Sequence, residues 1–231
     1  MAIITGASRG IGRATAELFA REGARLVICS RTRRELTRAV TTIKARGGDV
    51  AYRVMDIGSA RHARSLVDMA LRRYGKLDIL INNAGMLGPR VPIIDYPSVE
   101  WNEVLRVNLH GVFYLSQHAA RCMAPQQSGC IITLSSSVGR VGRGSWGAYA
   151  VSKFGVEGLT QVMADELRAC GICTVTFNPG GTRTKMRADA YPSENPTHLR
   201  DPAEVAQALL RIVLAASPSL SGRALDFDHV P

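Results

Sequence analysis

A tyrosine and a lysine four residues apart, Tyr149 and Lys153 in the segment Y-A-V-S-K, are the residues whose types and spacing point most directly to chemistry. The flanking sequence predicts a helix, and residues four apart on a helix share one face. A tyrosine has an unperturbed pKa of about 10, too high for an efficient base at neutral pH. A neighbouring ammonium favours the phenolate, so we expect Lys153 to lower the pKa of Tyr149. The pair could then donate and accept a proton, although the same spacing occurs on many helices without that role.

A glycine-rich turn near the start of the chain points to a phosphate-containing ligand. The segment T-G-A-S-R-G-I-G runs from Thr5 to Gly12, after a predicted strand and before a predicted helix. Gly6, Gly10 and Gly12 carry no side chain where the backbone must turn tightly and approach a pyrophosphate, and the helix that follows presents free N–H groups. The spacing differs from the commoner G-x-G-x-x-G, and a glycine turn alone can mark only a tight loop. Its place after the first strand indicates a dinucleotide site.

The end of the second predicted strand indicates which dinucleotide would bind. An NAD site usually has an acidic residue about 20 residues after the glycines, where it binds the ribose 2′-hydroxyl. Ser30 and Arg31 stand there instead, and Arg9 inside the turn adds a second guanidinium. Arginine makes charge-assisted, bidentate contacts to phosphate groups, so we expect NADP as the cofactor. The alternative is that Arg31 is a solvated residue at the start of a helix.

These residues must be positioned by the short apolar and longer amphipathic segments that alternate along the chain. We predict strands at 3–5, 25–29, 50–55, 77–83, 129–135, 172–177 and 223–227, and helices at 13–22, 33–46, 60–74, 99–123, 149–168 and 203–214. This pattern predicts an α/β fold with a doubly wound parallel sheet, Rossmann-like, in a single domain over residues 1–231. Ligands of such sheets bind beyond the carboxyl ends of the strands. Residues 185–200 are expected to form a loosely structured lid.

The order of the motifs resembles the short-chain dehydrogenase/reductase family, in the subgroup with T-G-x-x-x-G-x-G and Y-x-x-x-K. The resemblance covers nearly the whole chain. After the glycine turn come Asp56, N-N-A-G at 82–85, Asn108, a serine run after the fifth strand, Y-A-V-S-K, and N-P-G-G-T-R-T at 178–184. Each motif alone is modest, but the series in this order is very specific. It resembles the 3-oxoacyl thioester reductase branch of the family in particular.

The resemblance implies a role for each catalytic residue. Tyr149 would give its proton to the carbonyl oxygen as hydride arrives from the nicotinamide, and Lys153 would lower the pKa of that phenol and hold the nicotinamide ribose. Asn108 would bind a water that links Lys153 to solvent. The family serine precedes the tyrosine by about thirteen residues, which selects Ser136 to polarise the substrate oxygen. Its two serine neighbours are disfavoured because side chains alternate in direction along a strand.

The resemblance also implies the contacts to NADP. Residues 56–57 would meet the adenine, 83–85 would run beside the adenosine ribose, and 179–184 would close over the nicotinamide. Thr182 replaces the Ile or Val of many relatives, but a backbone contact survives that change. The predicted cofactor residues are Gly6, Ser8, Arg9, Gly10, Ile11, Gly12, Ser30, Arg31, Asp56, Ile57, Asn83, Ala84, Gly85, Tyr149, Lys153, Pro179, Gly180, Thr182 and Thr184.

Composition excludes other classes of protein. Apolar residues make up 46% and charged residues 21% of the 231, which is ordinary for a globular domain and wrong for a disordered chain. No stretch approaches the roughly 20 apolar residues of a membrane span, so no membrane partner is expected. The start of the chain does not resemble a secretory signal and the cysteine count of five is odd, which favours a cytoplasmic location. The C-x-x-C at Cys170 and Cys173 has no second ligand pair, so no metal is expected.

The net charge of +10 comes mostly from arginines spread along helices. Aromatic residues do not interleave with them, so we expect no nucleic-acid partner. Such a field would steer an acidic cofactor or an acidic acyl carrier toward the protein. The partners we expect are a small carbonyl or alcohol substrate and, from the family, further copies of the chain in a homodimer or homotetramer. The substrate could be a 3-oxoacyl thioester, a sugar, a polyol, a steroid or another small ketone. The alternative function is a non-catalytic NADP-binding regulator on the same fold.

Overall fold

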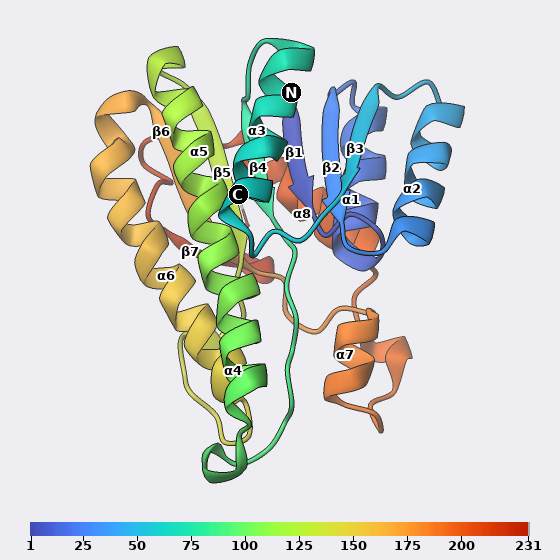
Figure 1. The fold of residues 1–231 in the computed structure, drawn as a ribbon, viewed down its shortest axis with the longest axis vertical. Helices are drawn as coiled ribbons and strands as arrows, with labels where there is room; N and C mark the ends of the chain where they lie inside the picture. The colour runs from blue at the N-terminus through green and yellow to red at the C-terminus, as the bar shows by residue number, and fades with distance from the viewer. Residues whose placement is uncertain (231) are drawn as a thin grey trace.

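A computed structural model describes residues 1–230, and its centre is a single sheet of seven parallel strands in the order β3-β2-β1-β4-β5-β6-β7 (Figure 1). The strands are β1 (Ala2–Thr5), β2 (Leu26–Ser30), β3 (Val50–Val54), β4 (Ile79–Asn82), β5 (Gly129–Leu134), β6 (Ile172–Asn178) and β7 (Ala224–Asp226). The strand order reverses direction between β1 and β4, which places a crevice at their carboxyl ends. The prediction of a doubly wound, Rossmann-like α/β fold is confirmed.

Helices cover both faces of the sheet. One face carries α1 (Gly10–Arg21), α2 (Arg33–Ala45) and α8 (Pro202–Leu214), and the other carries α3 (Ala60–Tyr74), α5 (Gly111–Gln126) and α6 (Gly147–Leu167). The helix α4 (Ser98–Leu105) runs into α5, and α7 (Lys185–Ala190) lies beyond the carboxyl ends of the strands (Figure 1). Short 3-10 helices occupy Ile93–Asp95, Ser137–Gly139, Arg168–Cys170, Pro196–His198 and Phe227–His229. Within residues 1–230, no helix combines the length and apolarity needed to cross a membrane.

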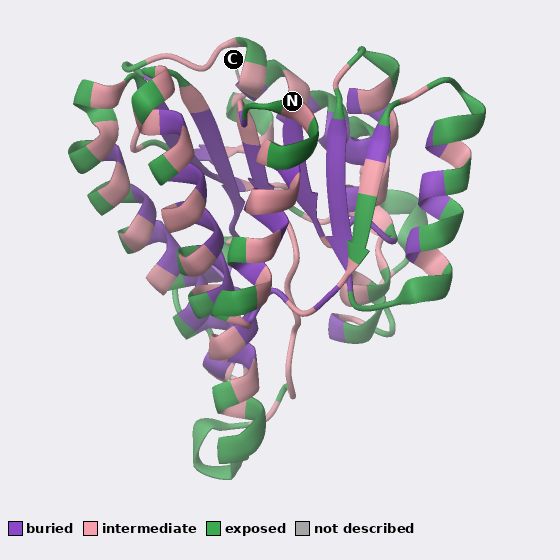
Figure 2. Ribbon diagram, turned by 45° about the horizontal axis from the view of Figure 1, so that its top comes forward, coloured by how far each residue is buried: buried purple, intermediate pink, exposed green. Residues whose placement is uncertain are grey.

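The core consists of two apolar layers, one on each side of the sheet. Successive side chains of a strand point to opposite faces, so Ala2 and Ile4 of β1 pack under α1 and α8, whereas Ile3 packs under α3 and α5. All three side chains are fully buried. Figure 2 shows the same division, with buried strands inside and exposed residues along the outer faces of the helices. The sheet therefore gives a rigid frame for the loops at its carboxyl edge.

Two predictions about helices need correction. The helix expected over 99–123 is not a single α-helix, because residues Arg106–His110 form a π-helix between α4 and α5. Residues 185–200, which we expected to be loosely structured, contain α7 and a 3-10 helix. The side chain of Thr184 caps α7 by accepting a hydrogen bond from the Arg187 backbone N–H at 3.2 Å. This cap stabilises the start of a helix within residues 185–200, which the composition of the segment did not indicate.

Candidate active site

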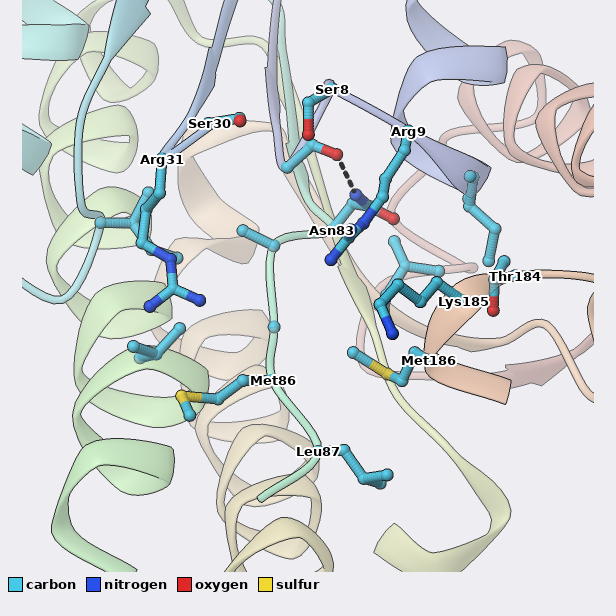
Figure 3. A pocket seen from close by; sticks show the side chains of 18 of the residues that line it. Ser8, Arg9, Ser30, Arg31, Asn83, Met86, Leu87, Thr184, Lys185 and Met186 are labelled. Carbon is cyan, nitrogen blue, oxygen red and sulfur yellow. Dashed lines mark hydrogen bonds between the residues drawn. The ribbon is translucent and has the colours of Figure 1, made fainter. Parts of the chain in front are cut away.

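A cavity of about 570 Å³ lies at the carboxyl edge of the sheet, where the strand order reverses (Figure 3). Most of the predicted cofactor residues line its wall, and they are Gly6, Ser8, Arg9, Gly10, Ile11, Ser30, Arg31, Asp56, Ile57, Asn83, Ala84, Gly85, Tyr149, Lys153, Pro179 and Thr184. Gly12, Gly180 and Thr182 are not part of the wall, nor are the predicted catalytic residues Asn108 and Ser136. Residues scattered over the whole sequence are thus brought together at one place.

The glycine turn packs against the chain that follows β4, and this contact leaves no room for side chains. A Cβ on Gly6 would lie 2.8 Å from the Ala84 Cα, and one on Gly12 would lie 2.4 Å from the Asn83 Nδ2 and 2.5 Å from the Gly6 carbonyl oxygen. Gly6 also has a φ of +66°, which disfavours any other residue. The Asn83 Nδ2 donates to the Thr5 carbonyl oxygen at 2.8 Å. Asn83 therefore holds the turn in place, a structural role beside the predicted contact with the ribose.

Two arginines stand at the end of the cavity where a 2′-phosphate is expected. Arg31 reaches into the cavity from the end of β2, and Arg9 enters from the glycine turn (Figure 3). Both guanidinium groups are more than half exposed, and each has a carboxylate nearby: Glu35 is 4.0 Å from Arg9 and Glu103 is 3.8 Å from Arg31. Exposed pairs at these distances are weak, so the guanidinium groups can still turn toward a phosphate.

Asp56 is engaged by the protein itself. Its Oδ2 accepts a hydrogen bond from the Arg106 Nη2 at 2.5 Å, and its Oδ1 accepts one from the Gly58 backbone N–H at 2.9 Å. Burial would raise the pKa of Asp56, but these hydrogen bonds and the positive charges of Arg106 and Arg31 outweigh it and lower the pKa. Arg106 lies 50 residues away along the chain, and no sequence signal identified it.

Tyr149 lies in the first turn of α6, beside the serines that follow β5. Ser136 is near enough to affect the pKa of the phenol, whereas the Ser135 hydroxyl donates to Glu157 at 2.5 Å. The structure thus places Ser136, not Ser135, beside the phenol. Burial raises the pKa of Tyr149 to about 12, and the hydrogen bond with Ser136 opposes this rise. The net change is therefore upward, because burial dominates, and the lowering that we expect from Lys153 is not among its causes in this structure.

Lys153 lies one helical turn after Tyr149 and is buried. Its Nζ is 5.5 Å from the centre of the Tyr149 ring and donates to the Leu134 carbonyl oxygen at 2.7 Å. Burial lowers the pKa of Lys153 to about 8, and the negative charge of Glu157 opposes this change. Lys153 is therefore mostly protonated at neutral pH, but it loses its proton at a lower pH than an exposed lysine does.

Glu157 lies behind Lys153, one further turn along α6, and is 7% exposed. Its two carboxylate oxygens accept hydrogen bonds from the Ser135 hydroxyl at 2.5 Å and the Thr176 hydroxyl at 2.6 Å. The Arg140 Nε is 3.6 Å from one of them. A buried carboxylate needs such partners to stay ionised. Sequence analysis did not identify Glu157, because a Glu four residues after a Lys is common on helices.

Asn108 lies within the π-helix and is buried. Its Nδ2 donates to the Met86 carbonyl oxygen at 2.9 Å and to the Ser152 hydroxyl at 3.1 Å, and its Oδ1 accepts from the Met86 backbone N–H at 2.9 Å. The side chain therefore ties the wall of the cavity to α6. A π-helix inside an α-helix is frequent at functional sites. Both Nδ2 donors of Asn108 are engaged, so a water on the predicted relay would have to donate to its backbone carbonyl oxygen or to the second lone pair of Oδ1.

The loop after β6 carries the remaining predicted cofactor residues. Thr182 is buried and its hydroxyl donates to the Gly180 carbonyl oxygen at 3.3 Å, while its backbone pairs with Arg200. Pro179 and Thr184 face the cavity. The structure thus gives the Thr182 side chain a partner inside the loop, consistent with a ligand contact that uses only the backbone.

The cavity has further wall residues that sequence analysis missed. They are Thr32, Met55, Met86, Leu87, Gly88, Arg90, Val107, Leu134, Ser135, Lys185, Met186 and Asp189. Met86, Leu87, Lys185 and Met186 are seen in Figure 3, where the two segments that carry them come together around the cavity. The side chains from 86–90 and 185–189 follow no motif, so only the three-dimensional structure could identify them.

Comparison with known proteins places this geometry in a family. A family model described as short chain dehydrogenase matches residues 1–195. The chain is 35% identical to the oxidoreductase YciK of Escherichia coli, over 99% of this chain and 91% of that protein. It is 32% identical to the 3-oxoacyl-[acyl-carrier-protein] reductase FabG of Thermotoga maritima, over 98% and 95%. A short chain dehydrogenase of Shigella flexneri, solved in complex with NADP, has a TM-score of 0.91 and 34% identity over 98% of this chain and 96% of that one.

Proposed function

Because the chain belongs to the short-chain dehydrogenase/reductase family and is an oxidoreductase acting on CH–OH groups, we propose that it interconverts a carbonyl and a secondary alcohol with NADP(H). The observation that carries this proposal is the convergence of Tyr149, Lys153 and the glycine turn on one cavity. Ser136 stands beside the phenol. A proton donor, a cation and a dinucleotide site in one cavity are what such a reaction requires.

NADP fits the residues that are present. The turn from Gly6 to Gly10 lines the cavity and leads directly into α1, whose first N–H groups would bind a pyrophosphate. At the end of β2 the wall holds Ser30 and Arg31 and no carboxylate, and Arg9 stands opposite. Two guanidinium groups favour a 2′-phosphate over a 2′-hydroxyl. When bound, NADPH supplies the hydride that reduces the carbonyl carbon.

The side chains of this protein would supply the proton. With a pKa of about 12, Tyr149 stays protonated at neutral pH and is ready to donate to a carbonyl oxygen. Ser136 would donate a second hydrogen bond to that oxygen. Lys153, with a pKa of about 8, is mostly an ammonium at pH 7 and would stabilise the phenolate that forms. Asn108 would hold the water from which the proton is replaced. In the reverse direction the same residues would accept the proton.

The substrate we propose is a 3-oxoacyl thioester or another small ketone. The similarity to the FabG reductase and the net charge of +10, which would attract an acidic carrier, support the thioester. We also propose a single domain over residues 1–231, a cytoplasmic location and a homodimer or homotetramer. Exposed apolar side chains on neighbouring helices, Phe113 of α5 and Phe154 of α6, at 41% and 46% exposure, support such an assembly.

The test is oxidation of NADPH, followed by its absorbance, across a panel of ketones, aldehydes and 3-oxoacyl thioesters. We expect turnover of at least one class by the wild type. Tyr149→Phe should lose most of this turnover while NADPH still binds, as measured by isothermal titration calorimetry. Tight NADPH binding without turnover of any carbonyl would contradict the proposal and favour a regulator.

A further inference from the structure

Arg90 is a cation on the cavity wall that has no acidic partner. Of the four other cations of the wall, three stand beside carboxylates, namely Arg9 beside Glu35, Arg31 beside Glu103 and Lys185 beside Asp189. The fourth is the buried Lys153, whose Nζ donates to the Leu134 carbonyl oxygen. Within residues 1–230, Arg90 forms no salt bridge. Asp189 is not the partner of Arg90, because both carboxylate oxygens of Asp189 accept hydrogen bonds from the Lys185 Nζ, at 2.8 and 3.0 Å. The positive charge of Arg90 is therefore available to a ligand in the cavity.

Aromatic rings and one hydrogen bond hold the guanidinium of Arg90 in position. Its central carbon lies 4.4 Å from the centre of the Trp146 ring and 5.1 Å from that of Tyr191. One of its five N–H groups donates to the Ala190 carbonyl oxygen at 2.5 Å. Within residues 1–230 the guanidinium makes no other hydrogen bond, so its remaining N–H groups could bind a carboxylate or a phosphate in a bidentate way. The group is thus oriented before any ligand arrives, which reduces the entropy lost on binding.

The guanidinium also lies near the reacting group. The Trp146 ring is 5.6 Å from the Tyr149 ring, so the Arg90 carbon is at most about 10 Å from the centre of the Tyr149 ring, the two distances laid end to end. Leu87 and Met186 line the cavity and pack in the same cluster as Trp146 and Tyr149 (Figure 3). A ligand that spans from Tyr149 to Arg90 would therefore have a polar group at each end and an apolar part between them.

We propose that Arg90 binds an acidic group of the substrate, so that the enzyme acts on a carbonyl compound or secondary alcohol that carries a carboxylate or a phosphate beyond a short apolar segment. This inference rests on the proposed function and specifies its substrate class. A carboxylate would belong to a small oxo acid, and a phosphate to a small ketone that carries a phosphate ester. The chemistry recognised at Arg90 is the same in both cases.

The experiment compares matched substrates with and without the anion. The pairs are 4-oxopentanoate and 5-oxohexanoate with their methyl esters, and 4-oxopentyl phosphate with 5-methoxypentan-2-one. For each pair the ratio of kcat/KM for the anion to that for its neutral partner is measured with NADPH. The enzymes are the wild type, Arg90→Met, Arg90→Lys and, as a matched control, Arg143→Met. Arg143 is an exposed arginine of the loop before α6 and does not line this cavity.

We expect the wild type to favour the anion of at least one pair tenfold or more, through a lower KM. Arg90→Met should reduce that ratio to near one, Arg90→Lys should keep part of it, and Arg143→Met should keep all of it. The pair that responds identifies the acidic group as a carboxylate or a phosphate. If Arg90 only fastened α7, its loss would slow both members of a pair equally, and an unchanged ratio would overturn the inference. A wild-type ratio near one in every pair would do the same. Absence of turnover with all substrates would instead contradict the proposed function.

Discussion

Replacement of the buried Lys153 by methionine should stabilise the folded protein at neutral pH. The structure lowers the pKa of Lys153 from 10.5 to about 8, mainly by burial. Below pH 8 the lysine is protonated in both states, and the folded state bears the whole cost of burying the ammonium. Between pH 8 and 10.5 the unfolded chain keeps a proton that the folded protein has released. The free energy of unfolding of the wild type therefore rises with pH in this range.

The magnitude follows from the difference between the two pKa values. A shift from 10.5 to about 8 corresponds to about 3 kcal/mol. Methionine is similar in length and uncharged, so Lys153→Met removes this cost. It also removes the hydrogen bond to the Leu134 carbonyl oxygen, a loss of about 1–2 kcal/mol that does not depend on pH. We expect the variant to be more stable than the wild type by about 1–2 kcal/mol at pH 7 and less stable at pH 10.5. Folded Tyr149 stays protonated over this pH range, because its pKa is about 12.

The assay is unfolding by guanidinium chloride, followed by circular dichroism without cofactor, at several pH values from 7 to 10.5. Lys76→Met is the control, because the Lys76 side chain is 51% exposed and has no comparable burial to relieve. The quantity of interest is the difference in free energy of unfolding between variant and wild type. A difference that stays constant across this pH range would refute the argument that Lys153 is buried as a costly ammonium.

Three further predictions concern the cofactor site and the ammonium. Gly12→Ala should weaken NADPH binding at least tenfold, as measured by calorimetry, because the new Cβ would lie 2.4 Å from the Asn83 Nδ2. An unchanged affinity would show that the turn can move to accommodate a side chain. Arg31→Asp should shift the ratio of kcat/KM for NADPH over NADH at least tenfold toward NADH, and a wild type that prefers NADH would contradict our interpretation of the 2′-phosphate site. Glu157→Gln should move the alkaline limb of the pH profile of kcat/KM to lower pH by about one unit, because the substitution removes the negative charge that favours the Lys153 ammonium. If the limb did not move, it would report the titration of a group other than Lys153.

The sheet and the glycine turn could be predicted because they depend on local sequence. Apolar runs such as Leu26–Ser30 mark strands buried on both faces, and Gly6 and Gly12 mark a turn that packs on backbone. The π-helix at Arg106–His110 could not be predicted, since Asn108 is fixed there by contacts with Met86 and α6, both distant in sequence. Such tertiary contacts override helix propensity.

The electrostatics of the site were the least predictable part. The four-residue spacing predicted that Tyr149 and Lys153 lie together. Whether the pKa of Tyr149 is raised or lowered depends on its burial, which the spacing does not give. The partners of the charged groups could not be predicted either, because they lie in other segments of the chain. Arg106 meets Asp56 across 50 residues, and Arg90 meets aromatic rings from two other segments.

The central claim is that Tyr149 delivers a proton while NADPH reduces a carbonyl, and transfer of deuterium tests it most directly. NADPH that carries deuterium at both positions of the nicotinamide C4 would be incubated with the enzyme and a ketone that it reduces, and the alcohol would be analysed by mass spectrometry. We predict one deuterium on the carbinol carbon with the wild type, and a rate lower by about 10²–10⁴-fold with Tyr149→Phe at saturating NADPH. Alcohol without deuterium, or a Phe variant that transfers it at the wild-type rate, would contradict the claim.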